Sequence, residues 1–194
     1  KALRESEEHA REVLKEIDEL LGKLPDDEIK KFARSDSFKR YERLLDRLGE
    51  IDKHYLRKEN QLFPILEKKG FSGPSSVMWA LHDDIRGMLK TAKAQIAGAC
   101  LSEAIDTLKS LLKTVGEMIY KEEHILYPTA LDMLNDTEWM LVRQGEEEIG
   151  YAWVTPGNEW RPQEERVAKA GESYPRSLDL DTGKLSLEQV NLIL

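Results

Sequence analysis

Four long stretches of the chain repeat their apolar residues at the i, i+3, i+4, i+7 spacing that places them on one face of an α-helix. They cover about residues 2–23, 37–69, 77–97 and 102–134, and each contains one of the chain's four histidines. A further short piece is expected at 26–33, and a turn at 73–76 precedes the third helix. Four long helices with short connections predict an all-α fold, an up-down-up-down four-helix bundle.

Beyond this bundle, assigned to residues 1–135, the composition changes. Residues 136–176 are interpreted as an extension and linker that packs on the bundle, with an alternating stretch at 149–154 that suggests a strand. Residues 177–194 are interpreted as the start of a connector to a C-terminal domain outside this sequence, and the pattern at 185–194 predicts an amphipathic helix. The chain is therefore expected to be a fragment.

Charge and composition argue against several classes of partner. The net charge of −8 at pH 7 disfavours nucleic acid, because phosphate binding relies on a basic surface. No apolar run approaches the roughly 20 residues that span a bilayer, and no signal peptide is recognised. The single cysteine allows no internal disulfide and fits a reducing compartment, so a cytoplasmic location is expected.

Five polar side chains are predicted to share the apolar faces of these helices: His9, His54, Glu59, His82 and Glu122. The fourth histidine, His124, is about 200° around its helix from Glu122 and is expected to face solvent, so it is not a candidate ligand.

Each inward residue also has a structural interpretation. A single inward histidine is more often a hydrogen-bonded core residue than a ligand, and an inward glutamate usually pairs with a base such as Lys58. Five such groups from four helices favour the metal-ligand interpretation over the structural one, because buried imidazoles and carboxylates must be hydrogen-bonded, paired or bound to a cation. One shared cation satisfies them together, so the pattern favours a metal site in the bundle.

Two segments, His54-Tyr-Leu-Arg-Lys-Glu-Asn-Gln-Leu-Phe-Pro64 and Lys121-Glu-Glu-His-Ile-Leu-Tyr-Pro128, resemble the paired motifs of hemerythrin-like, HHE-type cation-binding domains. The Glu8-His9 pair and His82 resemble the family's other two ligand-bearing helices. The resemblance implies a four-helix bundle with one or two non-haem irons, zinc or manganese being alternatives. The tail resembles a subfamily in which this bundle precedes a PAS sensor domain.

The chain departs from the family pattern at two positions. Lys58 stands where the family usually has a ligand glutamate, and Met118 where it usually has a histidine. With three histidines and two glutamates, the face suits one metal, or a carboxylate-rich pair of metals, better than an oxygen carrier.

Three functions follow as alternatives. The first is a metal-binding sensor or regulatory domain that reports oxygen, nitric oxide or redox state to a PAS domain of the same chain. The second is a non-haem iron enzyme acting on oxygen, peroxide or nitric oxide, with Tyr55 and Glu123 as nearby acid or base candidates. The third is a degenerate, metal-free interaction module in which Lys58 neutralises a buried glutamate. A homodimer is an open alternative for the assembly.

Overall fold

The computed structural model describes residues 2–22, 36–98, 100–155, 157, 177–180 and 183–186. The chain divides into two units, Lys1–Asn158 and Glu159–Leu194. In the second unit, the strands β1 (Ser177–Leu180) and β2 (Gly183–Ser186) form an antiparallel pair in which Ser177 faces Ser186. Leu185 and Ser186 therefore lie in a strand and not in the predicted terminal helix; the rest of that prediction, and the piece at 26–33, fall outside the described residues.

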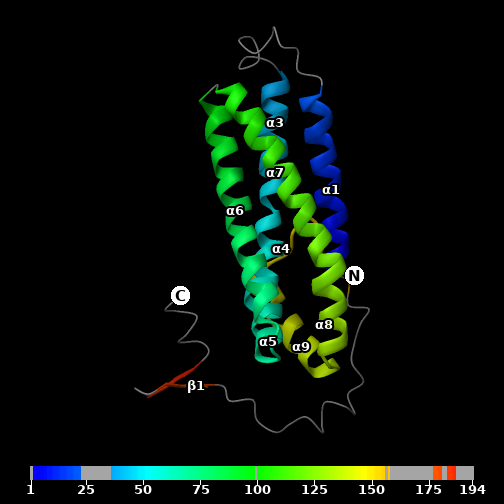
Figure 1. Cartoon of the computed structure of the whole chain (residues 1–194), viewed down its shortest axis with the longest axis vertical. Coiled ribbons are helices and arrows are strands. Elements are labelled where there is room, and N and C mark those ends of the chain that lie inside the picture. The colour runs from blue at the N-terminus through cyan, green and yellow to red at the C-terminus, as the bar shows by residue number, and fades with distance from the viewer. Residues whose placement is uncertain are drawn as a thin grey trace. The chain divides into compact units, whose positions relative to one another are not determined.

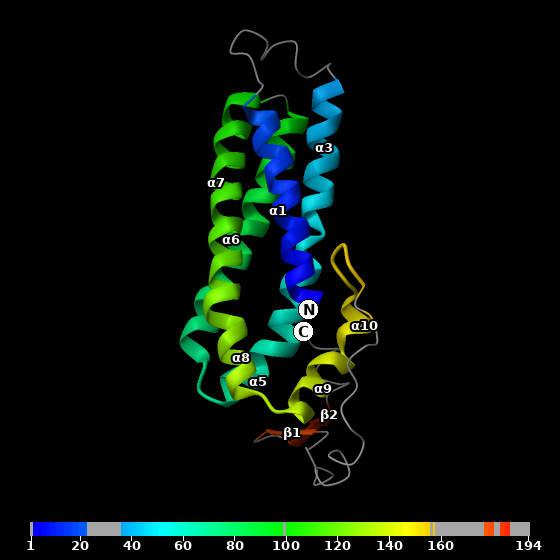
Figure 2. The ribbon, with the colours of Figure 1, turned by 90° about the vertical axis from the view of Figure 1, so that its right-hand side faces the viewer.

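The first unit is a bundle of four helical columns that run side by side, each antiparallel to the one before it (Figures 1 and 2). This confirms the all-α, up-down-up-down bundle. The columns are α1 (Ala2–Leu21); α3 (Asp36–Gly49) with α4 (Ile51–Arg57), η1 (Lys58–Leu62) and α5 (Phe63–Lys68); α6 (Ser72–Ala97); and α7 (Leu101–Lys121) with η2 (Glu122–Leu126) and α8 (Tyr127–Met133).

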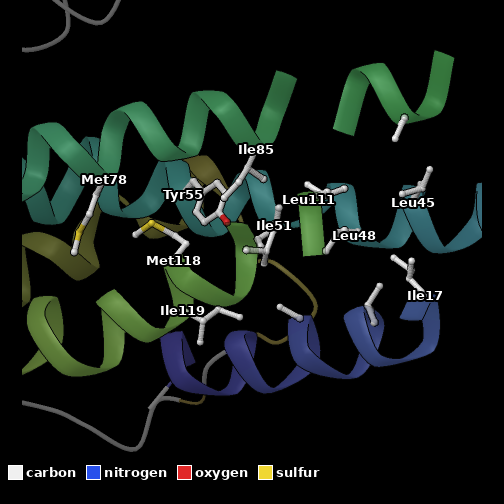
Figure 3. Close-up of a cluster of buried hydrophobic side chains, with 14 of the residues drawn as sticks. Ile17, Leu45, Leu48, Ile51, Tyr55, Met78, Ile85, Leu111, Met118 and Ile119 are labelled. Carbon is white, nitrogen blue, oxygen red and sulfur yellow. The ribbon is translucent and has the colours of Figure 1, made fainter. Parts of the chain in front are cut away.

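The apolar faces of the four columns meet in one continuous core. Figure 3 shows Tyr55, Met78 and Met118 pointing into this interior from α4, α6 and α7. Ile17 of α1 and Leu48 of α3 continue the core toward the other end, and both are fully buried. Burial of these faces is the main stabilising contribution to such a bundle, since isolated helices of this length are marginal in water.

The second and fourth columns are not the uninterrupted helices that the periodicity predicts. Each contains a π-helical turn, in which the N–H of Phe63 donates to the carbonyl of Lys58 and that of Tyr127 to the carbonyl of Glu122. A proline follows each aromatic residue. Proline lacks an N–H and its ring clashes with the carbonyl four residues earlier, and a wider turn just before it accommodates both effects. The two Leu-aromatic-Pro motifs thus end turns that begin at Lys58 and Glu122.

After the bundle, α9 (Asp136–Gln144) and α10 (Glu146–Ile149) form a short helical extension. Asn135 caps α9 in a capping box with Glu138, which satisfies two N–H groups at the helix start. The strand suggested at 149–154 is wrong. Ile149 ends α10, and Gly150 then adopts a φ of +84°, a left-handed conformation that breaks any extended run.

Within the described residues, no helix combines the length and apolar character needed to cross a membrane.

Candidate metal centre

The first group of buried polar side chains lies where the first, second and fourth columns meet. It consists of Glu7 from α1, His54 from α4, Lys58 from η1, Glu122 from η2 and Tyr127 from α8. Lys58 and Glu122 are both 0% exposed. Lysine and glutamate are almost never buried to this extent unless they are paired, so the contacts within the group decide its chemistry.

Glu122 is the centre of the hydrogen bonds in this group. His54 donates from Nε2 to Oε2 of Glu122 at 2.7 Å, and the Tyr127 hydroxyl donates to the same oxygen at 3.0 Å. The ammonium of Lys58 donates to the other carboxylate oxygen, Oε1. Glu122 therefore uses one oxygen for the neutral donors and the other for a cation.

Glu7 joins this network through Tyr127, whose hydroxyl oxygen lies 2.6 Å from Oε1 of Glu7. One ligand atom each of Glu7, His54 and Glu122 lies within 4.8 Å of the other two, and all three residues are buried. Two carboxylates and an imidazole in one buried cluster are donors that suit iron, zinc or manganese. Three helical columns thus contribute one potential metal ligand each.

Glu7 was missed by the sequence reasoning, and His9 was proposed in its place. The structure does not bring His9 to the group: it is half-buried, and its Nδ1 donates to the carbonyl oxygen of Glu5 at 2.9 Å. The sequence did contain a signal for Glu7, which precedes Ala10 by three residues and Ile17 by ten, both fully buried. The expected convergence of His9, His54 and His82 is therefore not found.

Glu7 joins the group and His9 does not because different helices cover the two edges of α1. Glu16 pairs with Arg47 at 3.0 Å, which places one edge of α1 against α3. Arg11 pairs with Glu123 at 2.6 Å, which places the opposite edge against η2. At 100° per residue, His9 lies close to the Glu16 edge and Glu7 close to the Arg11 edge. Only the second of these edges faces the Glu122 carboxylate.

A second buried group contains the remaining predicted residues, Glu59 and His82. Nδ1 of His82 donates to Oε1 of Glu59 at 2.6 Å. Arg86, one turn after His82 on α6, holds both oxygens of Glu59 in a two-pronged contact at 3.0 and 2.8 Å. Arg86 was not predicted as a partner of this site. Its guanidinium leaves Glu59 with both oxygens occupied, which is the strong bidentate geometry of an arginine–carboxylate pair.

Tyr55 lies against both groups. Its ring stacks on His82 with centroids 4.0 Å apart, and the Lys58 ammonium lies 4.5 Å from the centre of the same ring. The aromatic face supplies Lys58 with a favourable cation–π contact besides the bond to Glu122. The predicted inward positions of His54, Glu59, His82 and Glu122 are confirmed by their burial.

The two glutamates of the first group are held in opposite protonation states. Burial, together with the hydrogen bond to Glu122, raises the pKa of Glu7 to about 9. Burial alone would also raise the pKa of Glu122, but the charge of Lys58 and the contact with His54 outweigh it and hold that pKa well below its usual range. At neutral pH Glu7 is therefore protonated and Glu122 is a carboxylate. A protonated Glu7 can donate to Tyr127 while the phenol donates to Glu122.

Both inward histidines are neutral at physiological pH. Burial and the nearby charge of Lys58 lower the pKa of His54, and the same two causes lower the pKa of His82 to about 4. Burial also lowers the pKa of Lys58 itself. A neutral imidazole that donates one N–H retains an unprotonated nitrogen on the other side of the ring, which is the form that binds metals.

Those second nitrogens, His54 Nδ1 and His82 Nε2, are buried and have no hydrogen-bond partner among the described residues; the same holds for Oε2 of Glu7. Buried polar atoms are rarely left unsatisfied in proteins. Metal-binding histidines commonly donate their other ring N–H to a carboxylate, as His82 does to Glu59. The clustered donors of Glu7, His54 and Glu122 therefore fit a bound cation.

The remaining sequence predictions concern the fourth column. His124 is exposed and its Nδ1 donates to the carbonyl oxygen of Tyr120 at 2.9 Å, so the prediction that it faces away from the core is confirmed. Met118, where a further histidine was looked for, is fully buried in the apolar core one turn before Glu122. It offers this site a thioether and no nitrogen.

Comparison with known proteins agrees with this arrangement. Residues 1–130 match the sequence model of the hemerythrin HHE cation binding domain. A search of curated proteins finds no match.

Proposed function

Because the chain belongs to the hemerythrin HHE cation-binding domain family, we propose that its bundle is a sensor domain that holds one non-haem iron ion through Glu7, His54 and Glu122. The observation that carries the proposal is the approach of these three buried ligand atoms to within 4.8 Å of one another. His82, in the second buried group, has a ring nitrogen, Nε2, with no hydrogen-bond partner among the described residues. Iron bound by one or two imidazoles and carboxylates would supply open coordination positions and a change of redox state.

The residues of the chain have separate roles in this proposal. Glu122 accepts from Nε2 of His54 and so fixes the orientation of its ring. For both side chains to bind one cation, the proton must leave Nε2 so that this nitrogen presents its lone pair. The hydroxyl of Tyr127 is hydrogen-bonded to both Glu7 and Glu122 and so keeps the two carboxyl groups close together. Glu7 must give up its carboxyl proton before it can serve as a ligand, so metal uptake at neutral pH would release a proton.

The extension after the bundle supports the sensor interpretation. Ser6, next to Glu7 in the chain, donates to the carbonyl oxygen of Ala152 at 3.2 Å. Arg57, next to Lys58, donates to Glu146 of α10 and lies 4.9 Å from the centre of the Tyr151 ring. Immediate neighbours of two residues in the site thus hold the segment that leads toward the C-terminal part of the chain. A shift of α1 or η1 on metal binding or oxidation would be passed to this segment.

The metal content of wild-type protein and two histidine variants tests the metal proposal. We expect anaerobically purified protein supplied with Fe²⁺ to hold about one equivalent per chain, with His54→Ala losing it because a buried ligand is removed. His124→Ala is the matched control, since this exposed histidine of η2 lies outside the site. Wild-type values near zero with iron, zinc and manganese would overturn the metal proposal.

One observation favours the metal-free interaction module as the second candidate. The Lys58 ammonium is already bound to Glu122 and neutralises its charge. In that case Glu122 would be a structural partner of Lys58, and the near-zero metal content described above would be the result.

Hydrogen–deuterium exchange tests the sensor part of the proposal. Amides of residues 145–153 should change their exchange rate between the metal-free and iron-loaded protein, because local opening reports how firmly the extension is held. Arg57→Met, which removes the bond to Glu146, should weaken this response without changing the metal content. An extension whose exchange is the same in both states of the wild-type protein would contradict signal transfer by this route.

A further inference from the structure

The two buried groups differ in how their carboxylates are neutralised. Glu59 has both oxygens occupied by Arg86 and His82. Glu122 has one oxygen in contact with His54 and Tyr127, and the other is bound by Lys58. Each group therefore contains one fixed cation of the chain itself, Lys58 in the first and Arg86 in the second.

The surroundings of the Lys58 ammonium stabilise a positive charge. The side chain is 0% exposed, with its nitrogen on Glu122 and over the face of the Tyr55 ring at 4.5 Å. A carboxylate that bridges two metal ions presents one oxygen to each of them. Glu122 presents one oxygen to the neutral donors near Glu7 and the other to an ammonium.

We propose that Lys58 takes the place of a second metal ion at Glu122, so that the centre holds one metal ion and excludes another. This inference rests on the proposed function, since it concerns the capacity of the same site. Two positive unit charges in a poorly solvated interior repel each other strongly at short distance. A divalent cation adjacent to a buried ammonium would be repelled more strongly still. Arg86 has the same effect at Glu59, where its guanidinium contacts both carboxylate oxygens.

Metal stoichiometry at saturation tests the proposal, measured by equilibrium dialysis with Zn²⁺ and with Fe²⁺ under anaerobic conditions. Wild-type protein should saturate at one equivalent per chain. Lys58→Glu should saturate at two, because it replaces the competing cation by a further carboxylate beside Glu122. Lys58→Arg, which keeps the charge, should remain at one.

Lys53→Met is the matched control from α4, in the same helical column as Lys58. Lys53 is half-exposed and pairs with Glu50 at 2.6 Å, outside both buried groups, so its removal should leave one equivalent. Far-UV circular dichroism with and without metal establishes that each variant is folded. Should Lys58→Glu fail to fold, Lys58→Gln replaces it; this neutral side chain frees Oε1 of Glu122 and should also admit a second ion.

Several outcomes would overturn the proposal. Two equivalents in wild-type protein would show that the ammonium excludes nothing, whatever the variants do. One equivalent in a folded Lys58→Glu or Lys58→Gln protein would show that a different feature sets the limit. No metal in wild-type protein contradicts the proposed function separately; uptake by Lys58→Glu alone would then still identify Lys58 as the excluding cation, and no uptake by it would overturn both.

Discussion

Glu122→Gln should reduce bound metal to near zero and lower the free energy of unfolding by about 3–5 kcal/mol, the typical cost of breaking a buried charged pair. The substitution keeps the shape of the side chain and removes its charge. It leaves the fully buried Lys58 without the carboxylate that neutralises it, and it removes the ligand to which His54 and Tyr127 are hydrogen-bonded. Both effects come from a residue that is 0% exposed.

Metal analysis and chemical denaturation measure the two effects separately. The metal-site interpretation requires a large fall in metal content while circular dichroism shows that the helices remain. Unchanged metal content with a lower melting temperature would instead make Glu122 a structural ion-pair residue.

Glu123→Gln is the control, because it changes the neighbouring glutamate. Glu123 pairs with Arg11 at 2.6 Å at the partly exposed edge of the bundle. Surface pairs of this kind contribute roughly 0–1 kcal/mol, so metal content should be unchanged and stability nearly so. A similar loss of metal in both variants would mean that net charge, and not the position of Glu122, controls binding.

Glu7 should make the metal-free protein less stable as the pH rises from neutral to about 9. Its pKa is raised from 4.5 to about 9 in the folded protein, so the folded state retains a proton that the unfolded state has lost. The stabilisation that this proton provides is complete below about pH 4.5 and is lost as the pH rises through about 9. One proton of difference corresponds to a slope of up to about 1.4 kcal/mol per pH unit.

Glu7→Gln should abolish this decline, since an amide imitates the protonated carboxyl and does not titrate. The measurement is denaturant unfolding of chelator-treated protein at intervals between pH 6.5 and pH 9. Glu8→Gln is the control at the next position, where the side chain is exposed. The pKa of His82 is lowered from 6.5 to about 4, so its contribution to stability still rises with pH near pH 6.5 and is constant at higher pH. It is the same in wild type and Glu7→Gln and cancels in their comparison. Parallel curves for wild type and Glu7→Gln would show that Glu7 is ionised in the folded protein.

The sequence by itself determined the helical columns and predicted the burial of four polar side chains. Periodic apolar positions define a face to within a fraction of a turn. Glu59 and Glu122 lie near the centre of such faces, His82 lies within one, and His54 lies toward an edge. Side chains at the centre of a face are covered whichever helix packs against it, so their burial follows from the pattern alone.

The tertiary structure decided which residues at the edge of a face join the site. His9 and Glu7 lie toward opposite edges of α1, and only the packing of η2 against the Arg11 edge selects Glu7 for the site. Periodicity contains no information about which neighbour covers which edge. The contribution of Glu7 to the candidate site therefore depended on the arrangement of the columns.

The partner of each buried charge was also a tertiary outcome. The sequence left Lys58 free to pair with Glu59 or Glu122, its choice depending on side chains from separate helices. In the structure, Lys58 pairs with Glu122 and Arg86 pairs with Glu59. Local spacing fixes which face a residue occupies, but a hydrogen bond joins atoms that residues from distant parts of the chain bring within about 3 Å, and only the packed bundle sets that distance.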